Sequence, residues 1–381
     1  EDLMINQRNA GIYKWTETDG LSARAVDLSG IAGANLVPTK GLQVITSEKD
    51  RHLIVLGCDP ISGSSRTGVI DPMLIAFSDQ ENALDFEPLS TNTAGSLRLS
   101  SGSSIIGGVK ARQEILVWTD TALYSMQFIG PPFTFGINLI NEGTGLIGPK
   151  AAITTPSGVY WMSYNNFYTY NGSVQTLPCS VHNYVFTDIN LTQSFKINSF
   201  TIKDKSEVGW FYCSSSSDEI DRYVMYNYVE GIWFYGQLSR TAWLDYPRAV
   251  TNGYLYQQEK GFDDDGSPMT NVYIESSDLD IGDGEQFSFL KRIIPDYKFL
   301  QDQNAGHVNI VLKTRNYPGD SLTVNSTNAI SSSTQQAYVR SRSRQIALRF
   351  ESDDDATDDG NLGIGWRLGA TRIDIKPDGR R

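Results

Sequence analysis

Three stretches of the sequence decide the fold class. Residues 115–126 are ILVWTDTALYSM, residues 159–170 are VYWMSYNNFYTY, and residues 223–235 are YVMYNYVEGIWFY. Each has an apolar run, a short polar turn and a second apolar run, with Tyr or Trp on both arms, which is typical of a β-hairpin. Their centres lie about 45 to 65 residues apart, near the length of one propeller blade. They predict an all-β chain in which residues 1–270 form a β-propeller-like body.

The sequence changes character after residue 270. Residues 287–294 (FSFLKRII), 307–313 (HVNIVLK) and 344–351 (RQIALRFE) are predicted strands, whereas the Ser/Thr/Asn-rich residues 321–334 predict a long exposed loop. We expect residues 271–381 to form a small antiparallel β-sandwich or jelly-roll-like domain. Helical periodicity is scarce in the chain, and the best helix candidate is residues 183–199 (NYVFTDINLTQSFKINS).

Composition restricts the class of protein further. The chain has 381 residues, 40% of them hydrophobic, which is enough apolar material for a packed core. Its 44 acidic and 32 basic residues give a net charge of −12, and an acidic chain is poorly suited to gripping a phosphate backbone. Cys58, Cys179 and Cys213 are odd in number and far apart, which disfavours a disulfide framework. No apolar stretch is long enough to predict a membrane-spanning helix.

Motifs for catalysis are missing from the sequence. His52, His182 and His307 do not form a HExxH motif, and neither GxSxG nor GxxxxGK[ST] occurs. We therefore expect a protein that is not an enzyme, with no catalytic or cofactor-binding residues and no cofactor. Two distant carboxylates of a glycosidase remain a weak alternative, because such a pair has no sequence signature.

Two aspartate clusters resemble hard-cation ligands but are better explained as solvated turns. They are residues 263–265 and residues 353–359, and neither has the twelve-residue calcium loop with its terminal Glu. No metal site is therefore predicted. The many aromatic residues also have two interpretations, a carbohydrate-stacking platform or packing between sheets, and their alternation along strands favours packing.

Arg340, Arg342 and Arg344 alternate along one predicted strand, so their side chains should share one face. A strip of phosphate contacts is one interpretation. The favoured one is a subunit interface, in which the arginines pair with the acidic residues Asp353, Asp354 and Asp355 or with a neighbouring subunit.

An ordered set of sequence words resembles a family of structural tail proteins of short-tailed bacteriophages and their prophages. The words are EILVWTDTALYSMQFIG at 114–130, GLIG at 145–148, GVYWM at 158–162, FY at 167–168, YNG at 170–172, LPC at 177–179, YNY at 226–228, RTAW at 240–243, DIGDG at 280–284 and PDGRR at 377–381. They cover most of the chain from about residue 10 to its end, and the ordered set is more specific than any single word.

This resemblance implies a tail-nozzle or tubular tail protein located in the virion and synthesised in the cytoplasm of the bacterial host. It implies a homohexameric ring of propeller-like subunits that forms the exit channel for duplex DNA, passing without specific binding. The implied partners are the portal-proximal adaptor, the tail fibres and the host cell surface. Family members carry more sequence ahead of the GIYKWT word at 11–16, so we expect this chain to be most of a subunit. The alternative function is a receptor- or carbohydrate-binding tail protein.

Overall fold

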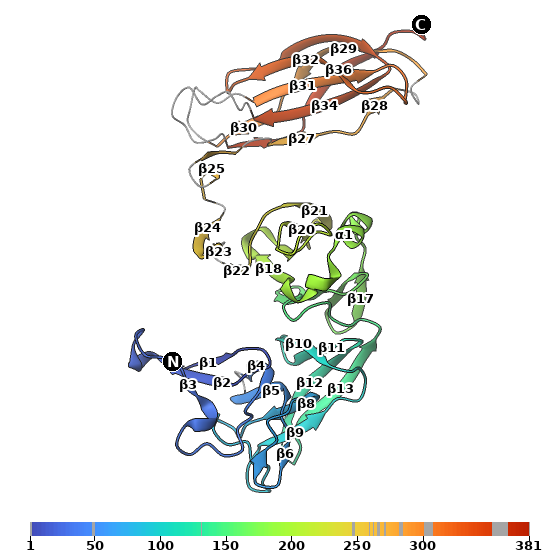
Figure 1. Ribbon diagram of the computed structural model, residues 1–381. Helices are drawn as coiled ribbons and strands as arrows, with labels where there is room; N and C mark the ends of the chain where they lie inside the picture. The colour runs from blue at the N-terminus through green and yellow to red at the C-terminus, as the bar shows by residue number, and fades with distance from the viewer. Residues whose placement is uncertain are drawn as a thin grey trace. The chain divides into compact units, whose positions relative to one another are not determined.

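The computed structural model is built almost entirely from antiparallel strands, which confirms the all-β prediction (Figure 1). It describes residues 2–47, 50–130, 132–245, 248–258, 260–261, 263–264, 267–269, 272–281, 285–300, 308–352 and 365–380. The chain divides into two compact units, Glu1–Gln258 and Glu259–Arg381. Within the described residues, no helix has the length and apolar character needed to cross a membrane.

In its described residues, the first unit contains six sheets of three or four strands that follow one another along the chain. The first and last have three strands each, namely β1 (Asp2–Asn6), β2 (Ile12–Thr16) and β3 (Val26–Asp27), and β22 (Ala242–Leu244), β23 (Arg248–Thr251) and β24 (Tyr254–Gln257). A separate short hairpin is formed by β6 (Ile61–Ser62) and β7 (Ser65–Arg66).

The four sheets between them have four strands each, in the order of the sequence. Their strands are β4 (Gly41–Ser47), β5 (His52–Cys58), β8 (Asp71–Phe77) and β9 (Gly95–Arg98); β10 (Ile105–Lys110), β11 (Ile115–Thr119), β12 (Ala122–Gly130) and β13 (Thr134–Glu142); β14 (Ala152–Thr155), β15 (Gly158–Met162), β16 (Phe167–Tyr170) and β17 (Val174–Leu177); and β18 (Asn198–Ile202), β19 (Glu207–Tyr212), β20 (Arg222–Asn227) and β21 (Ile232–Gln237). The three quoted hairpins correspond to β11–β12, β15–β16 and β20–β21.

The first strands of successive sheets contact one another, in the order β1, β4, β10, β14, β18 and β22. A four-stranded antiparallel meander is the topology of a propeller blade. The propeller-like interpretation rests on this topology, and closure of the six sheets into a ring stays a prediction.

Close packing between the second and third sheets depends on Gly108 in β10, which has no side chain. A Cβ atom at Gly108 would lie 2.8 Å from Leu56 Cδ1 and 3.0 Å from Ile45 Cδ1. Both distances are shorter than ordinary packing between carbon atoms. Glycine at this position therefore lets β10 approach the preceding sheet.

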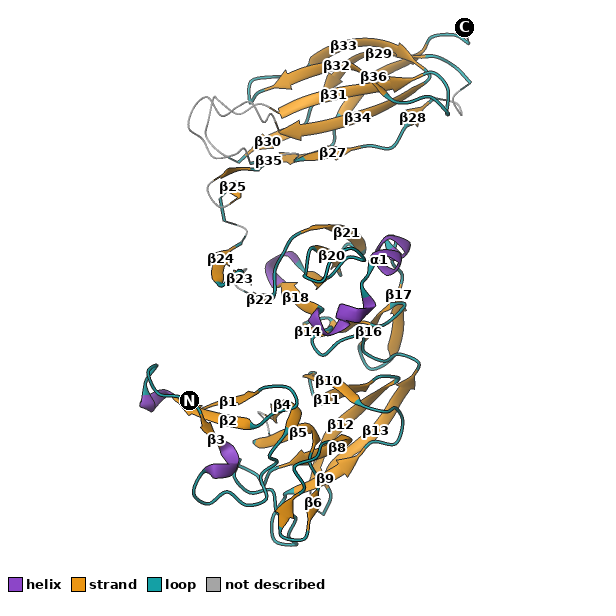
Figure 2. Ribbon diagram, viewed as in Figure 1, coloured by secondary structure: helices purple, strands orange, loops and turns teal. Residues whose placement is uncertain are grey.

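The helix expected over residues 183–199 is wrong in its extent. Helix α1 spans His182–Asp188, a 3₁₀ helix covers Leu191–Lys196, and β18 follows (Figure 2). The side chain of Asn190 accepts hydrogen bonds from the Thr192 backbone N–H at 3.1 Å and the Thr192 hydroxyl at 2.6 Å. Such local side-chain bonds compete with helical backbone bonds, and they begin a new turn where the predicted helix would continue. Three further 3₁₀ turns span Glu17–Asp19, Leu28–Gly30 and Lys203–Lys205.

The second unit is a sandwich of two antiparallel sheets. One has the order β27-β34-β31-β32, with β28 also pairing with β34, and the other has the order β33-β29-β36. Its strands are β27 (Tyr273–Glu275), β28 (Leu279–Asp280), β29 (Ser288–Ile294), β31 (Val308–Arg315), β32 (Thr323–Ile330), β33 (Ala337–Ser343), β34 (Gln345–Ser352) and β36 (Arg372–Pro377), with the pairs β25 (Asp263–Asp264) and β26 (Ser267–Pro268), and β30 (Tyr297–Phe299) and β35 (Trp366–Leu368).

The sandwich core includes Leu290, Ile310, Leu312 and Leu348 from facing sheets, as expected for a β-sandwich. The exposed loop predicted over residues 321–334 is wrong, because most of it is β32, which pairs with β31 along its length. β32 is an edge strand of its sheet and most of its side chains are exposed, so Ser, Thr and Asn are tolerated there.

Candidate functional site

Two of the three predicted interface arginines lie on the outward face of β33. Arg340 and Arg342 are exposed, and they alternate with the buried residues Val339, Ser341 and Ser343. Arg344 lies between β33 and β34 and is partly buried. The expected row is therefore limited to two residues on the strand, and the third arginine follows the end of the strand.

Arg342 is held by the C-terminal turn of its own chain. Its Nε lies 2.5 Å from Asp378 Oδ2, and its Nη2 donates a hydrogen bond to the Asp378 carbonyl at 3.0 Å. Its guanidinium also lies 4.1 Å from the ring centroid of Phe287, which is a cation–π geometry. Half-exposed ion pairs contribute little stability, so these contacts mainly fix the orientation of Arg342.

Arg344 contacts the same aromatic ring. Its guanidinium lies 4.9 Å from the Phe287 centroid, and it donates to the carbonyls of Glu285 at 3.3 Å and Arg380 at 3.2 Å. The backbone of Phe287 in turn pairs with Asp378 and Gly379 at 2.7 Å for each bond. Both arginines thus hold residues 377–380 against the start of β29.

Arg340 differs from the other two arginines. Its backbone has a φ of 46°, beside the β-bulge at which the pairing of β29 with β33 shifts between Leu290 and Arg292. It forms no ion pair with any residue in the described ranges. The expected acidic partners Asp353, Asp354 and Asp355 lie outside the described residues, so their pairing with these arginines stays a prediction.

The described histidine candidates have separate environments. His52 is buried, its Nδ1 lies 2.8 Å from the Ser78 carbonyl, and the rings of Phe77 and Phe135 pack around it. His182 Nε2 lies 2.6 Å from the Asn165 carbonyl, and His307 lies outside the described residues. Within the described ranges, His, Cys, Asp and Glu form no group of three that could hold a metal ion.

The three cysteines are free thiols. Burial raises the pKa of Cys58 to about 12, and burial also raises the pKa values of Cys179 and Cys213 to about 11. Thiols with raised pKa values remain protonated near neutral pH and react slowly. None of the three therefore has the properties of a catalytic nucleophile.

Inter-sheet tryptophans are a feature that the sequence interpretation missed. Trp118, Trp161 and Trp210 each occupy the fourth position of the second strand of a sheet, and all three are fully buried. Leu116, Val159 and Val208 precede them by two positions, so a pattern of an aliphatic residue, any residue and Trp would have located them.

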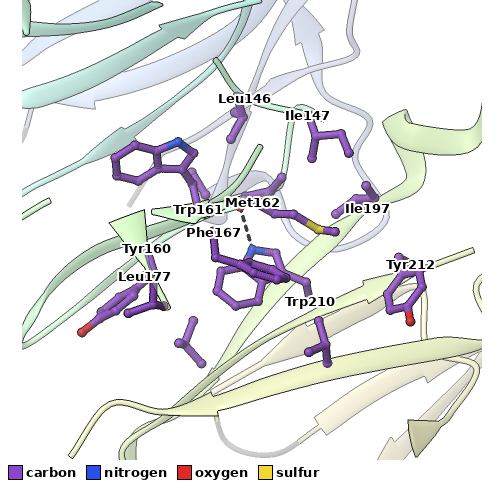
Figure 3. Packing of buried hydrophobic residues seen from close by; sticks show 14 of the residues in the cluster. Leu146, Ile147, Tyr160, Trp161, Met162, Phe167, Leu177, Ile197, Trp210 and Tyr212 are labelled. Carbon is purple, nitrogen blue, oxygen red and sulfur yellow. Dashed lines mark hydrogen bonds between the residues drawn. The ribbon is translucent and has the colours of Figure 1, made fainter. Parts of the chain in front are cut away.

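These tryptophans join neighbouring parts of the first unit. Trp161 Nε1 donates to the Thr144 carbonyl at 3.1 Å, and Trp210 Nε1 donates to the Ala151 carbonyl at 2.8 Å. The rings of Trp118 and Trp161 pack edge to face with centroids 5.3 Å apart. The ring centroids of Phe167 and Trp210 lie 4.8 Å apart, and Figure 3 shows these two side chains packed together. Buried aromatic packing together with a satisfied N–H group makes Trp161 and Trp210 rigid contacts between neighbouring parts of the unit.

No protein-family model and no curated protein matches this chain. Among solved structures, a variant of the Synechocystis apocarotenoid oxygenase is similar, with a TM-score of 0.32 and 8% sequence identity. The match covers 62% of this chain and 58% of the oxygenase, so it spans less than two thirds of that protein. At this level of similarity, the match indicates nothing about activity.

Proposed function

We propose that this chain is a structural subunit of a bacteriophage tail nozzle or tube, a homohexameric ring whose channel carries DNA during ejection. The observation that supports the proposal best is the position of the family-like sequence words in the fold. Trp118, Trp161 and Trp243 belong to those words, and all three occupy packed positions in the sheets. Trp243 Nε1 donates to the Thr201 carbonyl at 3.1 Å and so links the fifth sheet to the sixth.

In this proposal the protein acts passively, as a rigid scaffold that keeps a channel open. Tryptophan side chains link the third sheet through to the sixth, and the first strands of the first three sheets contact one another, which suits that role. The net charge of −12 supports a lumen that repels DNA, so that duplex DNA slides without specific binding. The proposed location is the virion tail, and the proposed partners are the adaptor, the tail fibres and the host cell surface.

The proposal includes no enzymatic activity and no cofactor. The described residues offer inert cysteines, a buried histidine and no candidate metal cluster, which supports a structural role. Assay of the purified chain for release of reducing sugars from host polysaccharide tests the glycosidase alternative. Release that a single Asp or Glu substitution abolishes would contradict the proposal.

The ring is tested by negative-stain microscopy of the purified chain. We expect sixfold rings with a pore about as wide as duplex DNA, and rings of another order or monomers at all concentrations would contradict the hexamer. A lumen that is predominantly basic in a structure of the ring would contradict the proposed repulsion of DNA.

The proposed interface is tested by substitution of its arginines. Replacing Arg340, Arg342 and Arg344 together by Glu should yield monomers in light scattering. Arg340→Glu alone is the sharper probe, because Arg342 and Arg344 also hold the C-terminal turn. Asp378→Asn is the matched control, since it removes the carboxylate that pairs with Arg342 and leaves Arg340 intact. Rings that persist in the triple variant would contradict the interface.

Carbohydrate binding is the second candidate function, and one observation favours it. Tyr184 and Tyr235 are both exposed, and their ring centroids lie 4.0 Å apart. Adjacent exposed aromatic rings suit stacking against a sugar. A glycan array with the full chain should show no reproducible ligand if the nozzle function is correct. A ligand lost in Tyr184→Ala would favour the receptor-binding function instead.

A further inference from the structure

One face of the sheet β33-β29-β36 is strongly basic. Side chains alternate between the core and solvent along these strands except at the β-bulge between Leu290 and Arg292, where Lys291 and Arg292 are both at least partly exposed. The outward positions include six cations and one carboxylate, that of Asp374. The six cations are Lys291, Arg292, Arg340, Arg342, Arg372 and Lys376. A chain with a net charge of −12 therefore concentrates positive charge on this one face.

Most of this charge has no partner in the described part of the chain. Arg292 pairs with Asp374 at 3.3 Å, and Arg342 pairs with Asp378. The remaining four form no ion pair with any described residue: Lys291, Arg340, Arg372 and Lys376. The face thus presents an excess of exposed cations to solvent.

The opposite sheet of the same sandwich is different. On β31 and β34, each of three cations pairs with a carboxylate from a strand of the same sheet or from the turn between β27 and β28. The paired groups are Lys313 with Glu275, Arg315 with Asp278, and Arg349 with Glu275 and Glu351. Two sheets of one small domain therefore differ in charge balance, so the excess on β33-β29-β36 is not a general property of this unit.

The arrangement of the basic face suits an extended row of negative charges. Outward side chains recur about every 6.8 Å along a strand, and neighbouring strands lie about 4.8 Å apart. Phe289 faces Arg342 on one side and Lys376 on the other, and Arg292 faces Tyr338. Aromatic rings among cations are the composition of surfaces that bind nucleic-acid strands without sequence preference, since phosphates meet the cations and bases stack on the rings.

A protein partner or a lipid surface fits this face less well than a nucleic acid does. Protein–protein interfaces are depleted of charged residues at their centres, and lysine is among the most depleted. Binding at a lipid surface needs an apolar face to bury beside the cations, whereas Tyr338 is the exposed large apolar side chain on this face. Interfaces with nucleic acid are the ones that are markedly positive.

We propose that the outer face of β33-β29-β36 binds a nucleic-acid strand through its phosphates, without sequence preference. This inference goes beyond the proposed channel and concerns a face within a single subunit. Arg340 and Arg342 on this face also belong to the proposed subunit interface, so a ring that buries them would leave Lys291, Arg372 and Lys376 to contact nucleic acid. The test therefore changes Lys291 and Lys376 and leaves the arginines of the interface intact, so that loss of nucleic-acid binding and loss of the ring are read separately.

The test is fluorescence anisotropy of the full chain with a labelled DNA strand of mixed sequence, about 30 nucleotides long. The matching duplex is a second probe. Affinity should fall steeply as salt rises from about 50 mM to about 200 mM, because phosphate contacts release counterions. In the variant Lys291→Gln/Lys376→Gln, the slope of log K against log salt should shrink by about 1 to 2, with roughly a tenfold loss of affinity at low salt.

The matched control is Lys298→Gln/Arg367→Gln. It removes the same charge from exposed residues that face each other across β30 and β35, outside the basic face. Its affinity should stay within about twofold of the unaltered chain. Circular dichroism and thermal unfolding of both variants check that they fold.

Three outcomes would overturn the proposal. The first is no binding of either DNA probe at low salt, and the second is equal loss of binding in both variants. The third is binding to vesicles of anionic phospholipid but not to DNA, with the same loss in the Lys291→Gln/Lys376→Gln variant, which would assign the face to a membrane. Loss in that variant alone, on either DNA probe, supports the proposal.

Discussion

Gln43 and Gly108 form a pair of hydrogen bonds that joins two sheets. The Gln43 side chain on β4 donates to the Gly108 carbonyl at 2.8 Å and accepts from the Gly108 N–H at 2.9 Å. The glutamine amide offers a donor and an acceptor together, so it bonds to both backbone groups of Gly108 as a neighbouring strand would. The contact connects the second sheet to the third, at the position where the lack of a side chain on Gly108 permits close packing.

Replacing Gln43 by Met should destabilise the first unit. Methionine has a similar size but leaves the partly buried N–H and carbonyl of Gly108 without their partner, at a cost of about 1 to 2 kcal/mol. Urea unfolding followed by tryptophan fluorescence measures the change. Gln175→Met, at an exposed position of β17, is the control and should shift the midpoint little. Equal stability of the two variants would show that the Gln43 bridge contributes nothing.

Replacement of a buried tryptophan by Phe should cost more stability at Trp210 than at Trp118. Trp210→Phe removes one of two hydrogen bonds to the Ala151 carbonyl, which still accepts from the Met162 N–H, whereas Trp118 Nε1 has no hydrogen-bond partner among the described residues. Both lose similar volume, so Trp210→Phe should cost about 1 kcal/mol more than Trp118→Phe. Thermal unfolding of the two variants measures the difference. The reverse order of stability would contradict the assigned hydrogen bond.

The cysteines should react slowly until the protein unfolds. With a pKa of about 11 for Cys213, only about one thiol in a thousand is ionised at pH 8. Cys58, with a pKa of about 12, should be slower still, and partly buried Cys179 should react first. Labelling with a thiol reagent, read by peptide mass spectrometry with and without denaturant, gives each rate. Fast labelling of Cys58 in the folded chain would contradict its burial.

These raised pKa values also predict the direction of alkaline unfolding. The unfolded thiols ionise near their ordinary pKa, below that of the folded state, so the folded state loses stability as pH rises from about 9 towards about 12. Tyr170 acts in the same direction, since burial and Glu114 raise its pKa to about 12. The unfolding midpoint in urea should therefore fall over this range. A midpoint that rises with pH would contradict the prediction.

Glu275 should stabilise the second unit more than a typical surface carboxylate. Its two oxygens lie 2.8 and 2.9 Å from Lys313 Nζ, and Arg349 Nη1 lies 3.7 Å away, with all three side chains about a quarter exposed. Glu275→Gln should cost about 1 to 2 kcal/mol, and less at high salt. Glu219→Gln, which removes a more exposed pair with Lys196, should cost under about 0.5 kcal/mol. Equal costs in urea unfolding would contradict the difference.

Local sequence patterns determined which segments are strands. Residues 115–126, 159–170 and 223–235 form hairpins because apolar alternation and polar turns act between residues close in the chain. The same alternation placed Arg340 and Arg342 on one face of β33. Local patterns failed where a distant partner decides the structure. Residues 323–330 look like a loop, yet pairing with β31 makes them a strand.

Only the tertiary structure decided which groups meet. Lys291 and Lys376 are 85 positions apart in the sequence, yet β33-β29-β36 pairing brings them to the face that carries Arg340. Trp161 bonds to Thr144, and Gln43 bonds to Gly108. No local sequence pattern predicts either pair of partners. The physical reason is that alternation fixes which side of a strand is apolar, whereas neighbouring strands are selected by burial of surface from distant segments. The sequence therefore determined strands and their faces, and the folded sheets decided the basic face and the contacts between sheets.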